Sequence, residues 1–164
     1  MTGVAGIECV DVHVVLDHHP IVNGVSVDVA PGTWTTVVGP NGAGKTTLVH
    51  AIAGLVDSTG EVRLGGRPIG AMHRRQRAQT IALVPQTPVI PPGMNVADYV
   101  SLGRTAHLSA WGGPKPGDRA VVADVVDRFD LTAFADRPVA SLSGGERQRC
   151  VLARALAQQS PILV

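Results

Sequence analysis

The sequence has 164 residues, of which 45% are hydrophobic and only 3% aromatic, so its length and apolar content are those of one domain with a sizeable core. A core with so few aromatic residues must be built from Val, Leu, Ile and Ala, which suits an α/β fold with buried parallel strands. The net charge of +1 comes from 14 basic and 13 acidic residues and supplies no overall field, so nucleic acid is not an expected partner.

The N-terminal third predicts paired strands. The segments 10–16 and 25–29 alternate or run apolar, and turn-forming residues at 17–20 and 23–24 separate them, so we expect an antiparallel pair. Pro31-Gly32 is expected to turn the chain into a buried β-branched strand at 35–38.

The stretch 39–47 fits the P-loop pattern of a glycine, four free positions and Gly-Lys-Ser/Thr. Its residues are Gly39, Pro40, Asn41, Gly42, Ala43, Gly44, Lys45, Thr46 and Thr47. Glycines let backbone N–H groups converge on a polyphosphate, and the apolar spacing of residues 44–56 predicts a helix whose N-terminus faces it. Lys45 is then expected to neutralise the phosphates, and the Thr46 hydroxyl to be a ligand of Mg²⁺.

A mixed segment follows the expected helix. Residues 61–64 predict a short strand that Gly65-Gly66 turns back, and residues 80–84 predict a further apolar strand. Between them, residues 72–79 predict a short basic helix. Its run of cationic residues at 73–77 fits either a nucleic-acid patch or a solvated face, and a solvated face is the commoner case on a near-neutral chain.

Three prolines at 87–93 exclude regular helix and central strand, so this segment is expected to be a subdomain boundary. Beyond it, residues 95–102 predict a helix capped by Asn95. Residues 118–129 predict another, with Val121, Val122, Val125, Val126 and Phe129 on one stripe. The segment 94–139 is expected to be a small helical insertion.

A second candidate phosphate site begins at Leu142. Ser143 and Glu146 stand three residues apart before a long apolar helical face, which is the pattern of a capping box. Capping alone does not need Gly144 and Gly145, since glycines cost backbone entropy in a helix. They are expected where a helix N-terminus must approach an anion closely.

Together, the P-loop, the Leu-Ser-Gly-Gly-Glu stretch and Gln86 between them resemble the nucleotide-binding subunit of ATP-binding cassette (ABC) transporters. The resemblance implies a P-loop NTPase (RecA-like) α/β core with an N-terminal antiparallel β region and a small helical subdomain. Residues 1–86 would hold the β region and P-loop core, 87–140 the helical subdomain, and 141–164 the signature helix and the start of the next core strand.

The resemblance also implies roles. Residues 39–47 and Gln86 would bind ATP, with Thr46 and Gln86 near Mg²⁺, while Ser143, Gly144, Gly145 and Glu146 would complete the ATP site of the opposite subunit. The partners would be a second copy or a paired ATPase subunit and an integral membrane permease, with a substrate-binding protein acting indirectly. No leader or membrane-spanning run is apparent, and Cys9 and Cys150 suggest a reducing compartment, so we expect a cytoplasmic protein on the inner face of the membrane.

The cargo is indicated by a finer resemblance. Residues 91–96 and the segment 102–107 (Leu-Gly-Arg-Thr-Ala-His) look like those of ATPases that serve importers of iron–siderophore complexes, haem and cobalamin. Zinc and manganese importers share much of this segment and form the alternative.

Two departures from the family pattern bear on activity. The family's strand that ends in an Mg²⁺-binding aspartate and a water-polarising glutamate starts here at 161–164, and neither carboxylate nor the later switch histidine follows. We expect a longer parent protein, and little or no ATP hydrolysis by the sequence as it stands. Leu16, with His18 and His19 nearby, occupies the place of the family's adenine-stacking aromatic residue.

Two further hypotheses remain open. A non-catalytic nucleotide-binding fragment fits the missing carboxylates. A soluble ABC-type ATPase acting on ribosomes or DNA would instead call for a second cassette, a coiled-coil insertion or a basic arm, none of which is apparent.

Overall fold

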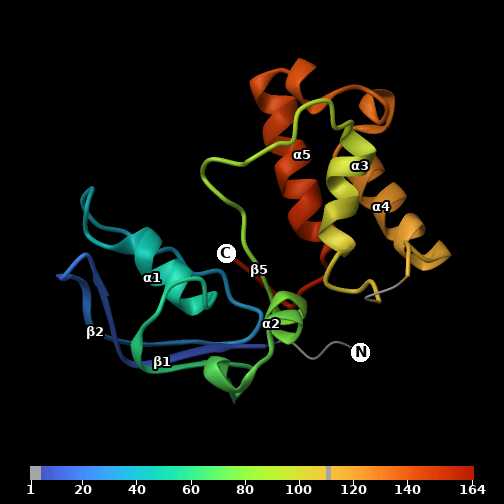
Figure 1. The fold of residues 1–164 in the computed structure, drawn as a ribbon. Coiled ribbons are helices and arrows are strands. Elements are labelled where there is room, and N and C mark those ends of the chain that lie inside the picture. Colours follow the sequence, from blue (N-terminus) through green and yellow to red (C-terminus); the bar gives the residue numbers. More distant parts are fainter. Residues whose placement is uncertain (1–4, 110–111) are drawn as a thin grey trace. The chain divides into compact units, whose positions relative to one another are not determined.

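The computed structural model describes residues 5–109 and 112–164, and the chain divides into two compact units. The first, called here the β unit, is Met1–Ile81 with Val164, and the second, the helical unit, is Ala82–Leu163 (Figure 1). The predicted P-loop lies in the β unit, whereas Gln86 and the predicted signature lie in the helical unit.

The β unit is built on a four-stranded antiparallel sheet in the order β2-β1-β3-β4. Its strands are β1 (Ile7–Leu16), β2 (His19–Val29), β3 (Thr59–Leu64) and β4 (Arg67–Pro68). The predicted antiparallel pair and the predicted strand at 61–64 are therefore confirmed, each strand being longer than expected. Two short strands, β5 (Ile81–Ala82) and β6 (Ile162–Leu163), make up a second sheet.

A bulge in β1 keeps its apolar residues on one face. Ile7 and Cys9 are buried before the bulge, and Val12 and Val14 after it, so the buried positions change from odd to even. Asp11 takes up the extra residue with a positive φ of 50°, and its N–H donates to Ser26 Oγ at 2.9 Å. Without that shift, one half of the strand would turn its apolar side chains to water.

The β1–β2 hairpin closes through two residues, Asp17 and His18, which both have positive φ as a type I′ turn requires. Asn23 and Gly24 were expected in the loop, and that expectation is wrong. They lie inside β2, because Gly24 takes a φ of 67° at an irregularity of the pairing and so lets the strand continue.

Helix α1 (Lys45–Ile52) follows the P-loop and packs Leu48, Ala51 and Ile52 inward. It was predicted to reach Val56 but stops earlier at Gly54, whose φ is 65°. The N–H of Leu55 donates to His50 O and that of Gly54 to Ala51 O, a Schellman motif that ends the helix. The residues after Gly54 continue the apolar spacing but not the helix.

The expected buried strand at 35–38 is not formed. Residues 31–43 are all exposed, with Trp34 94% and Val38 84% accessible, and residues 33–40 carry no strand pairing within the part of the chain that the structure describes. β-branched residues favour a strand only where neighbouring strands supply hydrogen bonds and cover, and the described residues supply neither here. The turn at Pro31-Gly32 is confirmed, with Thr33 N donating to Ala30 O at 3.3 Å.

The rest of the β unit follows the predictions in part. Gly65 and Gly66, both with positive φ, turn β3 into β4, and the predicted short basic helix is α2 (Arg74–Thr80), preceded by η1 (Ile69–Ala71). Only two residues of the strand predicted at 80–84 are paired, as β5.

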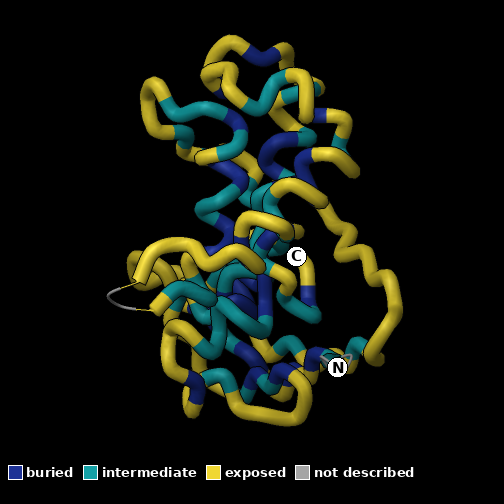
Figure 2. Tube along the Cα trace, turned by 90° about the vertical axis from the view of Figure 1, so that its right-hand side faces the viewer, coloured by how far each residue is buried: buried dark blue, intermediate teal, exposed yellow. Residues whose placement is uncertain are grey.

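The helical unit packs three helices side by side around an apolar core (Figure 1). Its elements are α3 (Val96–Ser101), η2 (Leu102–Arg104), α4 (Pro116–Arg128), η3 (Thr132–Phe134), η4 (Val139–Ser141) and α5 (Gly144–Ala157). The cap of α3 is confirmed, since Asp98 N donates to Asn95 Oδ1 at 2.7 Å. Every member of the predicted stripe on α4 is buried or packs on the core. Figure 2 shows buried residues in dark blue.

Both cysteines are free and buried. Burial raises the pKa of the Cys150 thiol, on α5, to about 11, and that of Cys9 above its ordinary value. Neither thiol is therefore ionised near neutral pH, and both act as small apolar core residues.

The close approach of β3 to β1 predicts a specific glycine requirement. Gly60 has a φ of 80°, and a Cβ there would clash with the Asp11 carbonyl, whereas Gly66 has a φ of 74° with open space around it. Gly66→Ala should therefore cost only backbone strain, about 1–2 kcal/mol, and Gly60→Ala clearly more. Urea unfolding of both variants measures this, and equal losses would contradict the clash.

Candidate functional site

The P-loop forms the turn between the exposed segment 33–40 and α1. Gly42 and Gly44 have φ values of 83° and 81°, in the left-handed region that side chains other than glycine rarely adopt. A Cβ on Gly44 would stand 2.5 Å from the carbonyl oxygen of Ile21, whereas around Gly42 the described residues leave open space. Gly44 is thus required for the loop to lie against β2, and Gly42 for the loop's own curvature.

Lys45 folds back over this loop. Its ammonium group donates to the carbonyl oxygens of Gly39 at 2.8 Å and Pro40 at 2.7 Å. The lysine charge is therefore held at the loop by two acceptors, and both bonds are exposed to solvent. This arrangement places a cation where the loop curves.

The N-terminal end of α1 is open. The first intrahelical bond runs from Leu48 N to Gly44 O at 2.8 Å, and no side chain within the described ranges caps this end. The N–H groups of Lys45, Thr46 and Thr47 therefore lie ahead of the helix's own hydrogen-bond ladder. Backbone donors, an ammonium group and the Thr46 hydroxyl form a donor set that fits a polyphosphate with its Mg²⁺.

The predicted capping box is confirmed at α5. Ser143 N donates to Glu146 Oε2 at 2.7 Å, and Glu146 N donates to Ser143 Oγ at 3.4 Å. These bonds to Ser143, backbone first, lower the pKa of the Glu146 carboxyl, and Arg137 and Arg149 add to the effect. The carboxylate form is the one that holds the helix start together.

Gly144 and Gly145 occupy the first two positions of α5. Both residues are exposed and neither has a positive φ. Apart from the chain neighbours and the helix's own nearby backbone, no described atom lies within 4 Å of where a Cβ would stand. Neither backbone conformation nor packing within the described residues thus explains these glycines. An external group that must approach the helix end closely would explain them.

Gln86 lies exposed just after β5, at the start of a stretch without helix or strand. The predicted absence of regular structure at 87–93 is confirmed, apart from a turn in which Met94 N donates to Pro91 O at 3.3 Å. The segments 94–96 and 137–139 then pair, with Val139 N donating to Met94 O at 2.9 Å.

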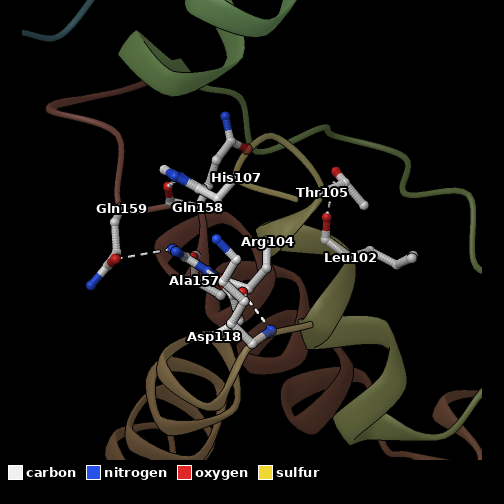
Figure 3. Close-up of polar contacts among 9 residues, drawn as sticks. Leu102, Arg104, Thr105, His107, Asp118, Ala157, Gln158 and Gln159 are labelled. Carbon is white, nitrogen blue, oxygen red and sulfur yellow. Dashed lines mark hydrogen bonds and ion pairs between the residues drawn. The ribbon is translucent and has the colours of Figure 1, made fainter. Parts of the chain in front are cut away.

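A polar cluster centred on Arg104 was not predicted. Its side chain and that of Asp118 are buried and joined at 3.0 Å, and Arg104 also reaches the last residue of α5 and Gln159 just beyond it (Figure 3). The sequence pointed to the segment 102–107 only as a marker of cargo. The spacing of an arginine and an aspartate fourteen residues apart, on separate elements, gave no signal of their pairing.

A profile of the ABC transporter family matches residues 22–164, so the chain belongs to this family. Several relatives are named as import ATP-binding proteins. The iron(3+)-hydroxamate import ATP-binding protein of Bacillus subtilis is 37% identical over 88% of this chain and 54% of that protein. The hemin import ATP-binding protein of Streptomyces coelicolor is 40% identical, over 91% and 53% respectively. The cobalamin import ATP-binding protein of Halobacterium salinarum is 41% identical, over 88% and 36%.

Solved structures of this family share the fold. A nucleotide-free ATP-binding cassette superposes with a TM-score of 0.83 at 22% identity, over 97% of this chain and 67% of that one. A bacterial Atm1-family ABC exporter with ATP bound gives 0.78 at 26%, over 99% and 29%. The expected fold class is confirmed. The chain spans about half the length of the first curated relatives it matches.

In the part of the chain that the structure describes, none of the helices has the length and apolar character that crossing a membrane requires.

The capping box predicts a pH dependence. The pKa of Glu146 is lowered in the folded protein, so the ionised carboxylate stabilises the fold at pH values above the ordinary pKa range of a glutamate. That stabilisation is lost as pH falls through the lowered pKa. Wild type should therefore melt at a higher temperature than Glu146→Gln above about pH 5, and the difference should vanish in acid.

Melting curves of both proteins from neutral to acid pH test this. Asp124→Asn serves as the control, because Asp124 forms an exposed ion pair with Arg128 at 3.6 Å, which should contribute little at any pH. A difference between wild type and Glu146→Gln that grows in acid would show the sign to be wrong.

Proposed function

We propose that this chain is the nucleotide-binding part of an ATP-hydrolysing subunit that powers import through a separate membrane permease. The observation that carries the proposal is the P-loop, in which Lys45 and the open N-terminus of α1 present donors to one place. The family membership supports ATP as the nucleotide.

Within this proposal the Lys45 ammonium, the first N–H groups of α1 and the Mg²⁺ ligand have separate tasks. On nucleotide binding, the Lys45 ammonium exchanges the carbonyls of Gly39 and Pro40 for phosphate oxygens, which are stronger acceptors because they are charged. The first N–H groups of α1 donate to the same phosphates. The Thr46 hydroxyl would hold Mg²⁺, which when bound neutralises phosphate charge during transfer.

The signature has a different task. The open space at Gly144 and Gly145 supports a phosphate that reaches α5 from outside the chain, as the γ-phosphate held by an opposite subunit would. The Ser143–Glu146 box leaves that end ordered without covering it with a larger side chain. Two copies, or this chain and a paired ATPase, would then close on two nucleotides.

The import names of the relatives support a cargo of iron–siderophore, haem or cobalamin, and a place on the inner face of the membrane beside the permease. A manganese transport system ATP-binding protein from Synechocystis is also 37% identical, which keeps a metal-ion importer as the second candidate. The cargo does not need to contact this subunit, so an assay of the assembled transporter must decide between them.

Removing the P-loop cation tests nucleotide binding. Lys45→Ala in the full-length protein should weaken ATP binding about 10- to 100-fold, because hydrogen bonds to charged groups contribute roughly 1.5–3 kcal/mol. Lys115→Ala is the matched control, since Lys115 is the other lysine of the sequence and lies exposed before α4. Titration with a fluorescent ATP analogue measures both, and wild-type affinity in Lys45→Ala would refute the site.

Replacing the two signature glycines with alanine should raise stability and lower ATP turnover. Because both sit in helical backbone with open space around them, Gly144→Ala with Gly145→Ala should raise stability, by up to about 1 kcal/mol per site. The same methyl groups would obstruct phosphate approach, so steady-state ATP turnover should fall while ATP affinity stays near wild type.

Gly117→Ala provides the control at the second position of α4, the same helical position that Gly145 holds in α5, also in open space. It should stabilise without reducing turnover. Full turnover in the double signature variant would rule out phosphate contact at α5.

A further inference from the structure

Arg104 connects three parts of the helical unit through one buried guanidinium (Figure 3). Its Nε donates to Asp118 Oδ1 at 3.0 Å, and its Nη1 donates to Ala157 O at 2.8 Å and to Gln159 Oε1 at 2.9 Å. Arg104 is 7% exposed and Asp118 8%. Burying a charged pair is costly unless the remaining donors are satisfied, so this geometry is tightly specified.

The aspartate is itself held in place. Asp118 lies in the first turn of α4, where its Oδ2 accepts from Lys115 N at 2.9 Å. That backbone bond, followed by the bond from Arg104, lowers the pKa of the Asp118 carboxyl, so it remains ionised. Arg104 therefore has a fixed anionic support on one side and the end of α5 on the other.

The last residue of α5 and the two that follow it are held by two side chains of one segment. Arg104 binds Ala157 and Gln159, and Nε2 of His107 lies 2.7 Å from Gln158 O. Gln159 has a φ of 53°, at which the chain leaves the helix. Three consecutive residues are thus fixed to the segment that follows α3.

One turn before Ala157, α5 is held to α3 by Arg154, which donates to Tyr99 Oη at 3.2 Å. At Ala157 itself the packing against Gly103 involves small groups only. The neighbours there are small: a Cβ on Gly103 would clash with Arg154 O and would stand 3.0 Å from the Ala157 Cβ. Surfaces without large interdigitating side chains resist sliding weakly, whereas a fork of directed hydrogen bonds resists it strongly. Arg104 therefore supplies the resistance to sliding that the small residues do not.

We propose that Arg104 is a positioning residue for the signature: by holding the C-terminal end of α5, it sets the axial position of Ser143 and Gly144 at the other end. A helix of 14 residues is about 21 Å long and nearly rigid, so a shift at one end appears at the other. This rests on the proposed function, in which the signature approaches the phosphate of an opposite subunit.

The test separates positioning from folding. Arg104→Lys in the full-length protein keeps a cation beside Asp118 but replaces the planar fork with a single ammonium group. It should lower kcat for ATP about tenfold, as a misplacement of less than about 1 Å would, since a full 1 Å can cost about 100-fold, while the Kd for ATP stays within about twofold of wild type. Arg128→Ala, which removes an exposed ion pair on α4, is the control and should leave both unchanged.

Gln159→Asn provides a second variant that does not threaten the fold. Gln159 is exposed, and asparagine tolerates its positive φ but is too short to reach Arg104. We expect kcat to fall about two- to threefold with unchanged ATP affinity.

Wild-type kcat in either folded variant would overturn the proposal. So would a loss of both kcat and ATP affinity in proportion to the fall in melting temperature, because that would show general destabilisation. If Arg104→Lys does not fold, Gln159→Asn alone decides. A wild-type protein that binds ATP but does not turn it over would refute the proposed function and this inference together, whereas wild-type turnover with insensitive variants would refute this inference only.

Discussion

The polar groups at the end of a helix need partners, and the helices that carry the two candidate sites meet this requirement differently. α5 begins with a capping box, in which Ser143 and Glu146 satisfy each other's backbone N–H groups. α1 begins at Gly44 with no side-chain cap among the described residues. An uncapped N-terminus beside a lysine has donors to offer a phosphate, and a capped one with two bare glycines can be approached without losing order.

Three glycines of this chain are explained by three different physical causes. At Gly44 the left-handed backbone and the nearby carbonyl of Ile21 both exclude a side chain, so the fold itself demands glycine. At Gly145 neither applies among the described residues, and the proposed reason is access for an external phosphate. At Gly103 the neighbouring turn of α5 leaves no room for a methyl group. A glycine-rich sequence therefore combines turn geometry, close packing and ligand access, and only coordinates distinguish among them.

Much of this could be predicted because its causes are local. The P-loop pattern, the capping box at Ser143 and the cap at Asn95 depend on residues within a few positions of one another. Periodicity also predicted α4, since its valine stripe repeats at helical spacing. One prediction was wrong because a partner is missing, since residues 35–38 have strand propensity without a paired neighbour among the described residues. Another was wrong for a local reason: α1 ends at the left-handed Gly54 although the apolar spacing continues.

The sequence by itself determined that this chain belongs to the ABC transporter family and predicted a P-loop at 39–47 and a signature at 143–146, because these motifs work through contiguous backbone. Only the tertiary structure decided that Arg104, Asp118 and the end of α5 meet in one buried cluster. Such a cluster depends on where three separate elements pack, and neither spacing nor propensity encodes that. The segment 102–107, whose resemblance to importer ATPases suggested a cargo group, also holds the C-terminal end of α5 through Arg104 and His107.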